Sequence, residues 1–138
     1  MKLEKTFPKI TTISKVCTVA DFTDGGSTSG YIDFSELLPS GAIPIAWKAV
    51  VTGAFKGDTS ATISVGVSGD TDRFSADTSQ SVFAAGTVGS FVLAADALDG
   101  IASVQTPRVT VTSATDFTTV VTDATGAMVV FLYYIKTV

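Results

Sequence analysis

Apolar residues alternate with polar or small residues along much of this chain, with a period of two. The pattern is clearest in residues 61–68, where Ala, Ile, Val and Val alternate with Thr, Ser, Gly and Ser. In residues 43–55 every second residue is also apolar or small, and Trp47 belongs to that set. Successive side chains of a strand point to opposite faces of a sheet, so the pattern predicts strands with one buried face. Trp47 is therefore expected to be a core residue.

The segment between these two strands predicts a hairpin. Residues 56–59 are Lys-Gly-Asp-Thr, and Gly and Asp both accept the backbone angles of a tight reversal. We therefore expect residues 43–55 and residues 61–68 to pair with each other.

A second hairpin is predicted at the end of the sequence. In residues 117–122, Phe, Thr and Val alternate with Thr, Val and Thr, as expected of a strand. Residues 123–126 would form a turn, and residues 127–136 would return as the second strand. Both faces of this last strand are apolar. Such a strand is either central in a two-layer fold or has one face against another subunit.

The other elements are expected to be short. Further strand candidates are residues 10–22, 29–34, 81–84, 89–93 and 108–112, and single helical turns could form at residues 35–38, 70–74 and 94–98. The alternation slips between Ile13 and Val16, which suggests a bulge or two short strands. Eight or nine short strands with Gly, Ser and Asp turns predict an all-β fold. It would be an antiparallel β-sandwich or jelly roll in one domain, residues 10–138.

The mean hydropathy of +0.43 is high for a soluble monomer. A membrane-spanning helix needs about 20 consecutive apolar residues, and the longest run here, residues 127–135, is shorter. The N-terminal residues lack the continuous apolar stretch of a secretion signal, so we expect synthesis in the cytoplasm of the host and no membrane partner. A buried interface is the better explanation of the apolar excess.

Composition also limits the chemistry. The chain has no histidine and one cysteine among 138 residues, which excludes an internal disulfide, Ser-His-Asp catalysis and nearly all catalytic zinc sites. The aspartates lie mostly in turns, where they bond nearby backbone amides. Cys17, in an apolar stretch, is expected to be a small buried residue. Few charges and no basic stripe argue against nucleic acid. We therefore expect no enzymatic activity and no cofactor.

Residues 69–77 are a candidate calcium-binding loop. Asp70, Asp72 and Asp77 could offer oxygens to calcium, but the loop lacks the glycine and the distal glutamate of an EF-hand. Arg73 would also repel the ion. A capped turn with Phe74 packed into the sandwich is the preferred interpretation.

The charges are unevenly distributed. Residues 1–20 hold four lysines and one glutamate, a net charge of +3, whereas the remaining residues hold five cations and twelve anions, a net charge of −7. Residues 1–9, the N-terminal arm, are either a solvated terminus or a basic segment that docks on an acidic neighbour.

Residues 53–74 contain two characteristic motifs, Ala-Thr-Ile-Ser-Val-Gly at residues 61–66 and Gly-Asp-Thr-Asp-Arg-Phe at residues 69–74. In these motifs the segment resembles small β-rich virion proteins of tailed bacteriophages. It covers about a sixth of the chain. The resemblance implies a virion structural protein, most simply a capsid decoration (cement) protein. Its partner would be the major capsid protein or another virion protein. It also implies a homo-oligomer, with a trimer favoured. A head-tail or tail accessory protein is the nearest variant.

The partner-binding residues expected from this are in the N-terminal arm. Leu3 and Phe7 would be apolar anchors, and Lys2, Lys5 and Lys9 would contact an acidic patch on a neighbouring subunit.

The alternative is a carbohydrate-binding β-sandwich module of a fibre or cell-surface protein. It would need at least one of four aromatic residues on a solvent face: Trp47, Tyr31, Tyr133 or Tyr134.

Overall fold

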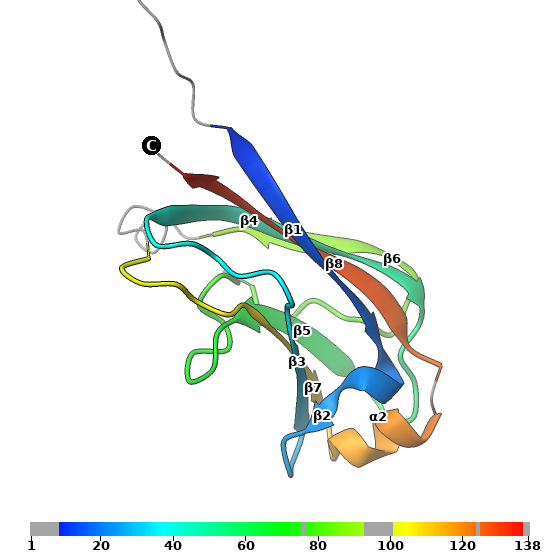
Figure 1. The fold of residues 1–138 in the computed structure, drawn as a ribbon. Helices are drawn as coiled ribbons and strands as arrows, with labels where there is room; N and C mark the ends of the chain where they lie inside the picture. Colours follow the sequence, from blue (N-terminus) through cyan, green and yellow to red (C-terminus); the bar gives the residue numbers. More distant parts are fainter. Residues whose placement is uncertain (1–8, 76, 93–100, 124, 137–138) are drawn as a thin grey trace, which may run out of the picture.

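Two four-stranded antiparallel sheets packed face to face make up the fold (Figure 1). The computed structural model describes residues 9–75, 77–92, 101–123 and 125–136. Sheet A has the order β1-β8-β4-β6, with strands Ile10–Thr18, Ala127–Lys136, Ala42–Gly53 and Gly86–Phe91. Sheet B has the order β2-β3-β7-β5, with strands Thr23–Asp24, Ser29–Asp33, Arg108–Ser113 and Ala61–Gly66. The predicted all-β sandwich is confirmed.

The connections cross between the sheets. The chain passes from β3 in sheet B to β4 in sheet A and back to β5, and it returns from β7 to β8 in the same way. Residues 80–82 extend sheet B beyond β5. The Ile63 amide donates to the Gln80 carbonyl at 3.0 Å, and the Val82 amide donates to the Ala61 carbonyl at 3.0 Å. Eight strands in two sheets with such crossovers form a jelly roll.

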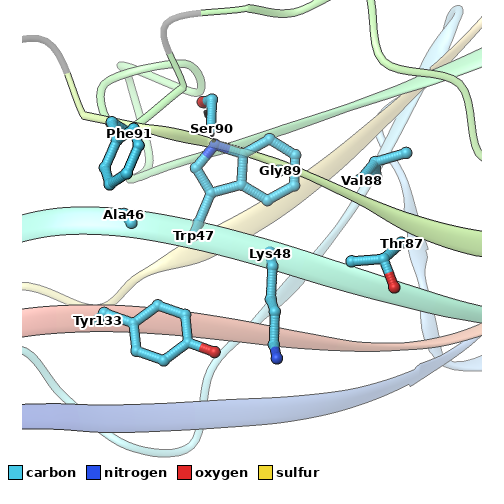
Figure 2. A pocket seen from close by; sticks show the side chains of 9 residues that line it. All are labelled: Ala46, Trp47, Lys48, Thr87, Val88, Gly89, Ser90, Phe91 and Tyr133. Carbon is cyan, nitrogen blue, oxygen red and sulfur yellow. Dashed lines mark hydrogen bonds between the residues drawn. The ribbon is translucent and has the colours of Figure 1, made fainter.

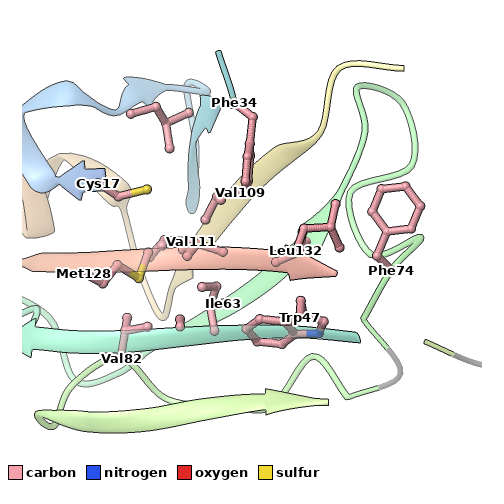
Figure 3. Packing of buried hydrophobic residues seen from close by; sticks show 14 of the residues in the cluster. Cys17, Phe34, Trp47, Ile63, Phe74, Val82, Val109, Val111, Met128 and Leu132 are labelled. Atoms are coloured by element: carbon pink, nitrogen blue, oxygen red, sulfur yellow. The ribbon is translucent and has the colours of Figure 1, made fainter. Parts of the chain in front are cut away.

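The core lies between the inward faces of the two sheets (Figure 3). Trp47 and Leu132 project into it from sheet A, and Ile63 and Val111 from sheet B, all with at most 2% of their surface exposed. Complete burial of one such side chain stabilises a fold by roughly 1.5–3 kcal/mol. The prediction that Trp47 is a core residue is confirmed.

The predicted hairpin between residues 43–55 and residues 61–68 is wrong. β4 pairs with β6 and β8 in sheet A, whereas β5 pairs with β7 in sheet B. Phe55, just after β4, is fully buried, and its amide donates to the Val82 carbonyl at 2.9 Å. Because this ring is buried, the chain crosses from sheet A to sheet B after β4. The glycine turn at residues 56–59 therefore lies in a connection between two sheets.

The second predicted hairpin is also wrong, because Phe117–Asp123 is a helix, α2, rather than a strand. The Asp116 carboxylate accepts a 2.9 Å hydrogen bond from the Thr118 amide, as an N-cap residue does. Phe117 and Val120, three residues apart, are buried, so the apolar residues have helical spacing. No helix in the described part of the chain is long and apolar enough to cross a membrane.

The first strand, β1, is continuous, unlike the expectation for this segment. It is one strand, paired with β8 without interruption from Ile10↔Ile135 to Thr18↔Ala127, so the bulge or break predicted near Ile13 is wrong. The single-turn helix η1 (Val19–Asp21) follows it. The apparent slip arises because Ile13 and Cys17 face the core while Val16, with 64% of its surface exposed, faces outward.

The remaining short elements differ in detail. Residues 35–38 form no helical turn, because the Leu38 amide and carbonyl pair with Gln105. Residues 81–84 contribute one isolated bridge, Thr62↔Ser81, instead of a strand. β6 begins at Gly86, before the predicted residues 89–93. The helical turn predicted at residues 94–98 lies outside the described residues.

Candidate interaction surface

The outward face of sheet A is apolar, although it lies on the surface of the described structure. Along β8 the residues alternate between buried and half-buried. Met128 and Leu132 point into the core, whereas Val129, Phe131 and Tyr133 point outward. A strand with one solvated face normally carries polar residues on that face. β8 does not, so its outer side is suited to contact.

Neighbouring strands continue this surface with a mixture of apolar residues and hydroxyls, the latter at Thr12, Ser14 and Thr87. Val16 of β1 and Val50 of β4 flank Val129, one on each side, in the register of the sheet. Phe91, on the edge strand β6, is 81% exposed. We call this surface the outer face of sheet A and define it by Val16, Val50, Phe91, Val129, Phe131 and Tyr133.

Lys48 is the only charged residue that the register places on this face among the described strands. It lies between Phe131 of β8 and Gly89 of β6. Its ammonium nitrogen is 5.1 Å from the centroid of the Phe131 ring, within the range of a cation–π contact. Among the described strands, the register thus places on this face one positive charge, already against an aromatic ring, and no carboxylate. The Glu36 carboxylate lies at the edge of β1, where it accepts a 3.3 Å bond from the Ser14 amide.

An open depression of about 460 Å³ lies at the β6 side of this face (Figure 2). Phe91 and Tyr133 stand on either side of Ala46, which opposes both of them in the sheet. A Cβ atom on Gly89 would collide with the backbone of Trp47 and Lys48, so glycine is required for the close approach of β4 and β6. Aromatic rings around a shallow, apolar hollow favour an apolar contact.

The outward face of sheet B has a different character. Hydroxyl side chains alternate along its strands, with Thr62 and Ser64 on β5 paired to Thr112 and Thr110 on β7, of which Ser64 and Thr110 are themselves buried. Tyr31 lies beneath Arg108, whose guanidinium carbon is 3.8 Å from the ring centroid. The Arg108 guanidinium also pairs with the Asp33 carboxylate at 2.7 Å. The apolar excess of the sequence is thus concentrated on the core and on one outer face.

Four of the five predicted partner-binding residues lie outside the described residues, namely Lys2, Leu3, Lys5 and Phe7. Lys9 is exposed and immediately precedes β1, an edge strand of sheet A.

The four aromatic residues on which the carbohydrate-binding alternative depends differ in their exposure to solvent. Trp47 is 2% exposed, Tyr134 is 8% exposed, and Tyr31 is covered by Arg108. Tyr133 alone of the four belongs to the apolar outer face. Phe91, beside it, was not predicted, because Gly86, Gly89 and Ser90 dilute the apolar pattern of β6.

The remaining reactive groups are held in structural roles. Cys17 is fully buried, and burial raises the pKa of its thiol to about 12, so it is not a nucleophile near neutral pH. Phe74 is 1% exposed, which confirms its predicted packing in the sandwich. The Asp77 carboxylate accepts a 2.8 Å bond from the Ser79 amide. Within the described residues, no three Asp, Glu or Cys residues are grouped so that they could hold a metal ion.

Comparison with known proteins supports the fold. No protein-family model matches this chain, and no curated protein matches it in sequence. A chain of the cyanophage Pam1 capsid asymmetric unit is similar in structure, with a TM-score of 0.60, 17% identity and coverage of 99% of this chain and 94% of that chain. A chain of the capsid of Ralstonia phage GP4 has a TM-score of 0.56, 17% identity and coverage of 100% and 92%. This protein therefore has, over its whole length, the fold of chains found in phage capsid structures.

Proposed function

We propose that this protein is a non-enzymatic virion structural protein, a capsid decoration (cement) protein that binds the outer capsid surface and stabilises the head. The observation that carries the proposal is the outer face of sheet A, on which Phe91 and Val16 are exposed by 81% and 64%. Large exposed apolar patches mark interaction sites. The fold shared with chains of two phage capsid structures supports a particle as the place of that interaction.

The proposed partners follow the distribution of charge. The N-terminal arm, residues 1–9, has Leu3 and Phe7 as apolar anchors and lysines that suit an acidic patch. We assign the arm to the contact with the major capsid protein or another virion protein. The domain of residues 10–138 would then associate with its own copies, with a trimer favoured. The protein would be made in the host cytoplasm and end in the virion.

Oligomerisation would strengthen attachment to a shell. A single arm of nine residues offers a small contact, and weak contacts of that size dissociate quickly. Linked copies bind a repeating surface with a raised effective concentration, so several weak contacts become a tight one. Bridging neighbouring capsid subunits in this way would oppose their separation under heat or internal pressure.

The test is reconstitution on purified heads that lack this protein. Full-length protein should cosediment with the heads and raise the temperature at which they release DNA. Deletion of residues 1–9 should weaken cosedimentation at least tenfold. Lys56→Ala, which removes an exposed cation from the body of the protein, is the control and should bind as the full chain does.

Two results would contradict the proposal. Full-length protein that does not bind heads would exclude decoration, and binding to tails or necks instead would indicate an accessory role there. Unchanged head binding after deletion of residues 1–9 would exclude the arm as the attachment segment.

A further inference from the structure

We propose that the outer face of sheet A is the surface through which copies of this chain associate, so that its partner is a second copy of the same chain. This inference rests on the proposed function and deepens it, because it names the surface that builds the oligomer. Attachment to the capsid is left to the N-terminal arm.

The size of the face fits a specific interface. Four strands spaced about 4.8 Å apart give a width of about 19 Å, and the ten-residue strand β8 spans about 34 Å, so the flat area of the whole face is at most about 650 Å². This area includes Lys48 and the hydroxyls of Thr12, Ser14 and Thr87. A standard protein interface buries about 800 Å² on each partner, so the face is of the size that one partner of a specific contact uses.

The charges on the face favour an apolar partner over a charged one. Lys48 already contacts the Phe131 ring, and the described strands place no carboxylate there to receive a cation. A lysine-rich segment such as residues 1–9 would meet one like charge and no opposite charge. Burying an unpaired charge is unfavourable. A second copy adds one cation, its own Lys48, which already lies against its Phe131 ring, whereas residues 1–9 would add three lysines.

The shape of the face is also suited to self-association. Phe91 protrudes from the edge strand β6, and the 460 Å³ depression lies next to it. Each copy therefore offers a projecting ring and a hollow side by side, as a contact between identical subunits requires. Two apolar sheet faces pack about 10 Å apart with their strands nearly aligned.

The first experiment measures the mass of the purified full-length protein by light scattering and sedimentation, without particles. The wild type should be an oligomer at micromolar concentration. Phe91→Glu and Val16→Glu, at opposite edges of the face, should each raise the dissociation constant at least tenfold and shift the protein toward monomer. Val104→Glu is the matched control, since Val104 is 56% exposed but lies outside the strands of sheet A, and it should stay oligomeric. Native Trp47 emission checks the fold of every variant.

A second measurement does not depend on a glutamate being tolerated. Phe91→Cys and Val104→Cys place a thiol on the face and off it, while Cys17 is buried and does not compete. A maleimide should label Cys at position 91 at least tenfold more slowly than Cys at position 104 in the oligomer. Dilution to monomer should remove the difference.

The outcomes separate this inference from the proposed function. A wild-type monomer that still binds heads would overturn the self-association surface and leave decoration standing; if Phe91→Glu then weakened head binding, the face would be the capsid contact. An oligomer that Phe91→Glu and Val16→Glu do not disturb would also overturn it. An oligomer sensitive to both variants that fails to bind heads would support the surface and contradict decoration. Loss of the oligomer on deleting residues 1–9 would assign association to the arm and overturn the inference.

Discussion

The indole nitrogen of Trp47 donates a hydrogen bond of 2.9 Å to the hydroxyl of Ser90, joining β4 to β6 on the core side of sheet A (Figure 2). Because successive residues of a strand face opposite ways, Ser90 pointing inward turns Phe91 outward. This partly buried polar contact thus supports the register of the edge strand, which presents the most exposed aromatic ring of the outer face of sheet A.

Ser90→Ala tests this link. The Trp47 side chain is nearly fully buried, so loss of its acceptor leaves an unsatisfied donor, which costs roughly 1–3 kcal/mol. We expect the free energy of unfolding in urea, followed by Trp47 fluorescence, to fall by about that amount. Ser68→Ala, at an exposed loop position, should change it by less than about 0.5 kcal/mol. Equal stability of the two variants would show that the contact is not structural.

Gly30→Ala tests the packing of α2 against sheet B. A Cβ atom at position 30 would overlap the ring of Phe117, the first residue of α2, which is fully buried. Overpacking of this kind costs about 3 kcal/mol. Gly26→Ala is the matched glycine control, because nothing lies within 4 Å of its new methyl group. The only expected cost is that of placing an L residue at a φ of +85°, about 1 kcal/mol. Thermal unfolding that ranks Gly26→Ala as the more damaging change would refute the packing.

Because the Cys17 thiol is buried, we expect the protein to lose stability at alkaline pH. Its pKa is raised from 9.0 to about 12 by burial, so above pH 9 the unfolded state loses its thiol proton while the folded state keeps it. The free energy of unfolding should therefore fall with rising pH by up to about 1.4 kcal/mol per unit, and the loss is complete near pH 12. Between pH 8 and pH 10.5 the wild type should lose about 2 kcal/mol more than Cys17→Ala in urea melts. Parallel pH profiles of the two proteins would contradict this.

Because hydrogen bonds lower the pKa of Asp58, we expect its contribution to stability to be lost at acid pH. Its carboxylate accepts a 2.8 Å bond from the Thr115 amide and a 2.6 Å bond from the Thr59 amide, and these hold its pKa well below the usual 3.8. Its contribution is present above pH 3.8 and is lost as the pH falls further. Asp58→Asn should lower the melting temperature at pH 7, and the difference from wild type should shrink below pH 3.8. Asp72→Asn, at an exposed turn, is the control. A difference that grows in acid would exclude the assigned bonds.

The period-two pattern was a sound guide to strands and to the core. It located β3, β5, β7 and β8 closely and placed Trp47 inside, because alternation directly records which face of a strand is buried. It does not record which sheet a strand joins. The crossing from β4 to β5 depends on burial of Phe55, a tertiary contact that local spacing does not reveal.

The helix α2 was missed for a related reason. A seven-residue segment spans only two turns, so its apolar residues fit both periodicities, and β-branched Thr and Val favour strands. The deciding signals were the N-cap residue Asp116 and the spacing of Phe117 and Val120, both present in the sequence.

The candidate surface was half predictable. The two apolar faces of residues 127–136 indicated an interface, and the structure places one of those faces outside the core. Its extension across the sheet was not predictable, since Val16 appeared as a break in the pattern and Phe91 stands in a glycine-rich strand. Only the register of β1, β8, β4 and β6 brings these residues together.

We propose above all that this protein is a structural part of a virus particle. The most direct measurement is quantitative mass spectrometry of density-purified particles of the phage whose genome encodes it. The account predicts the protein in those particles at a fixed ratio to the major capsid protein, retained through washing in moderate salt. Its absence from intact, DNA-filled particles would contradict the account.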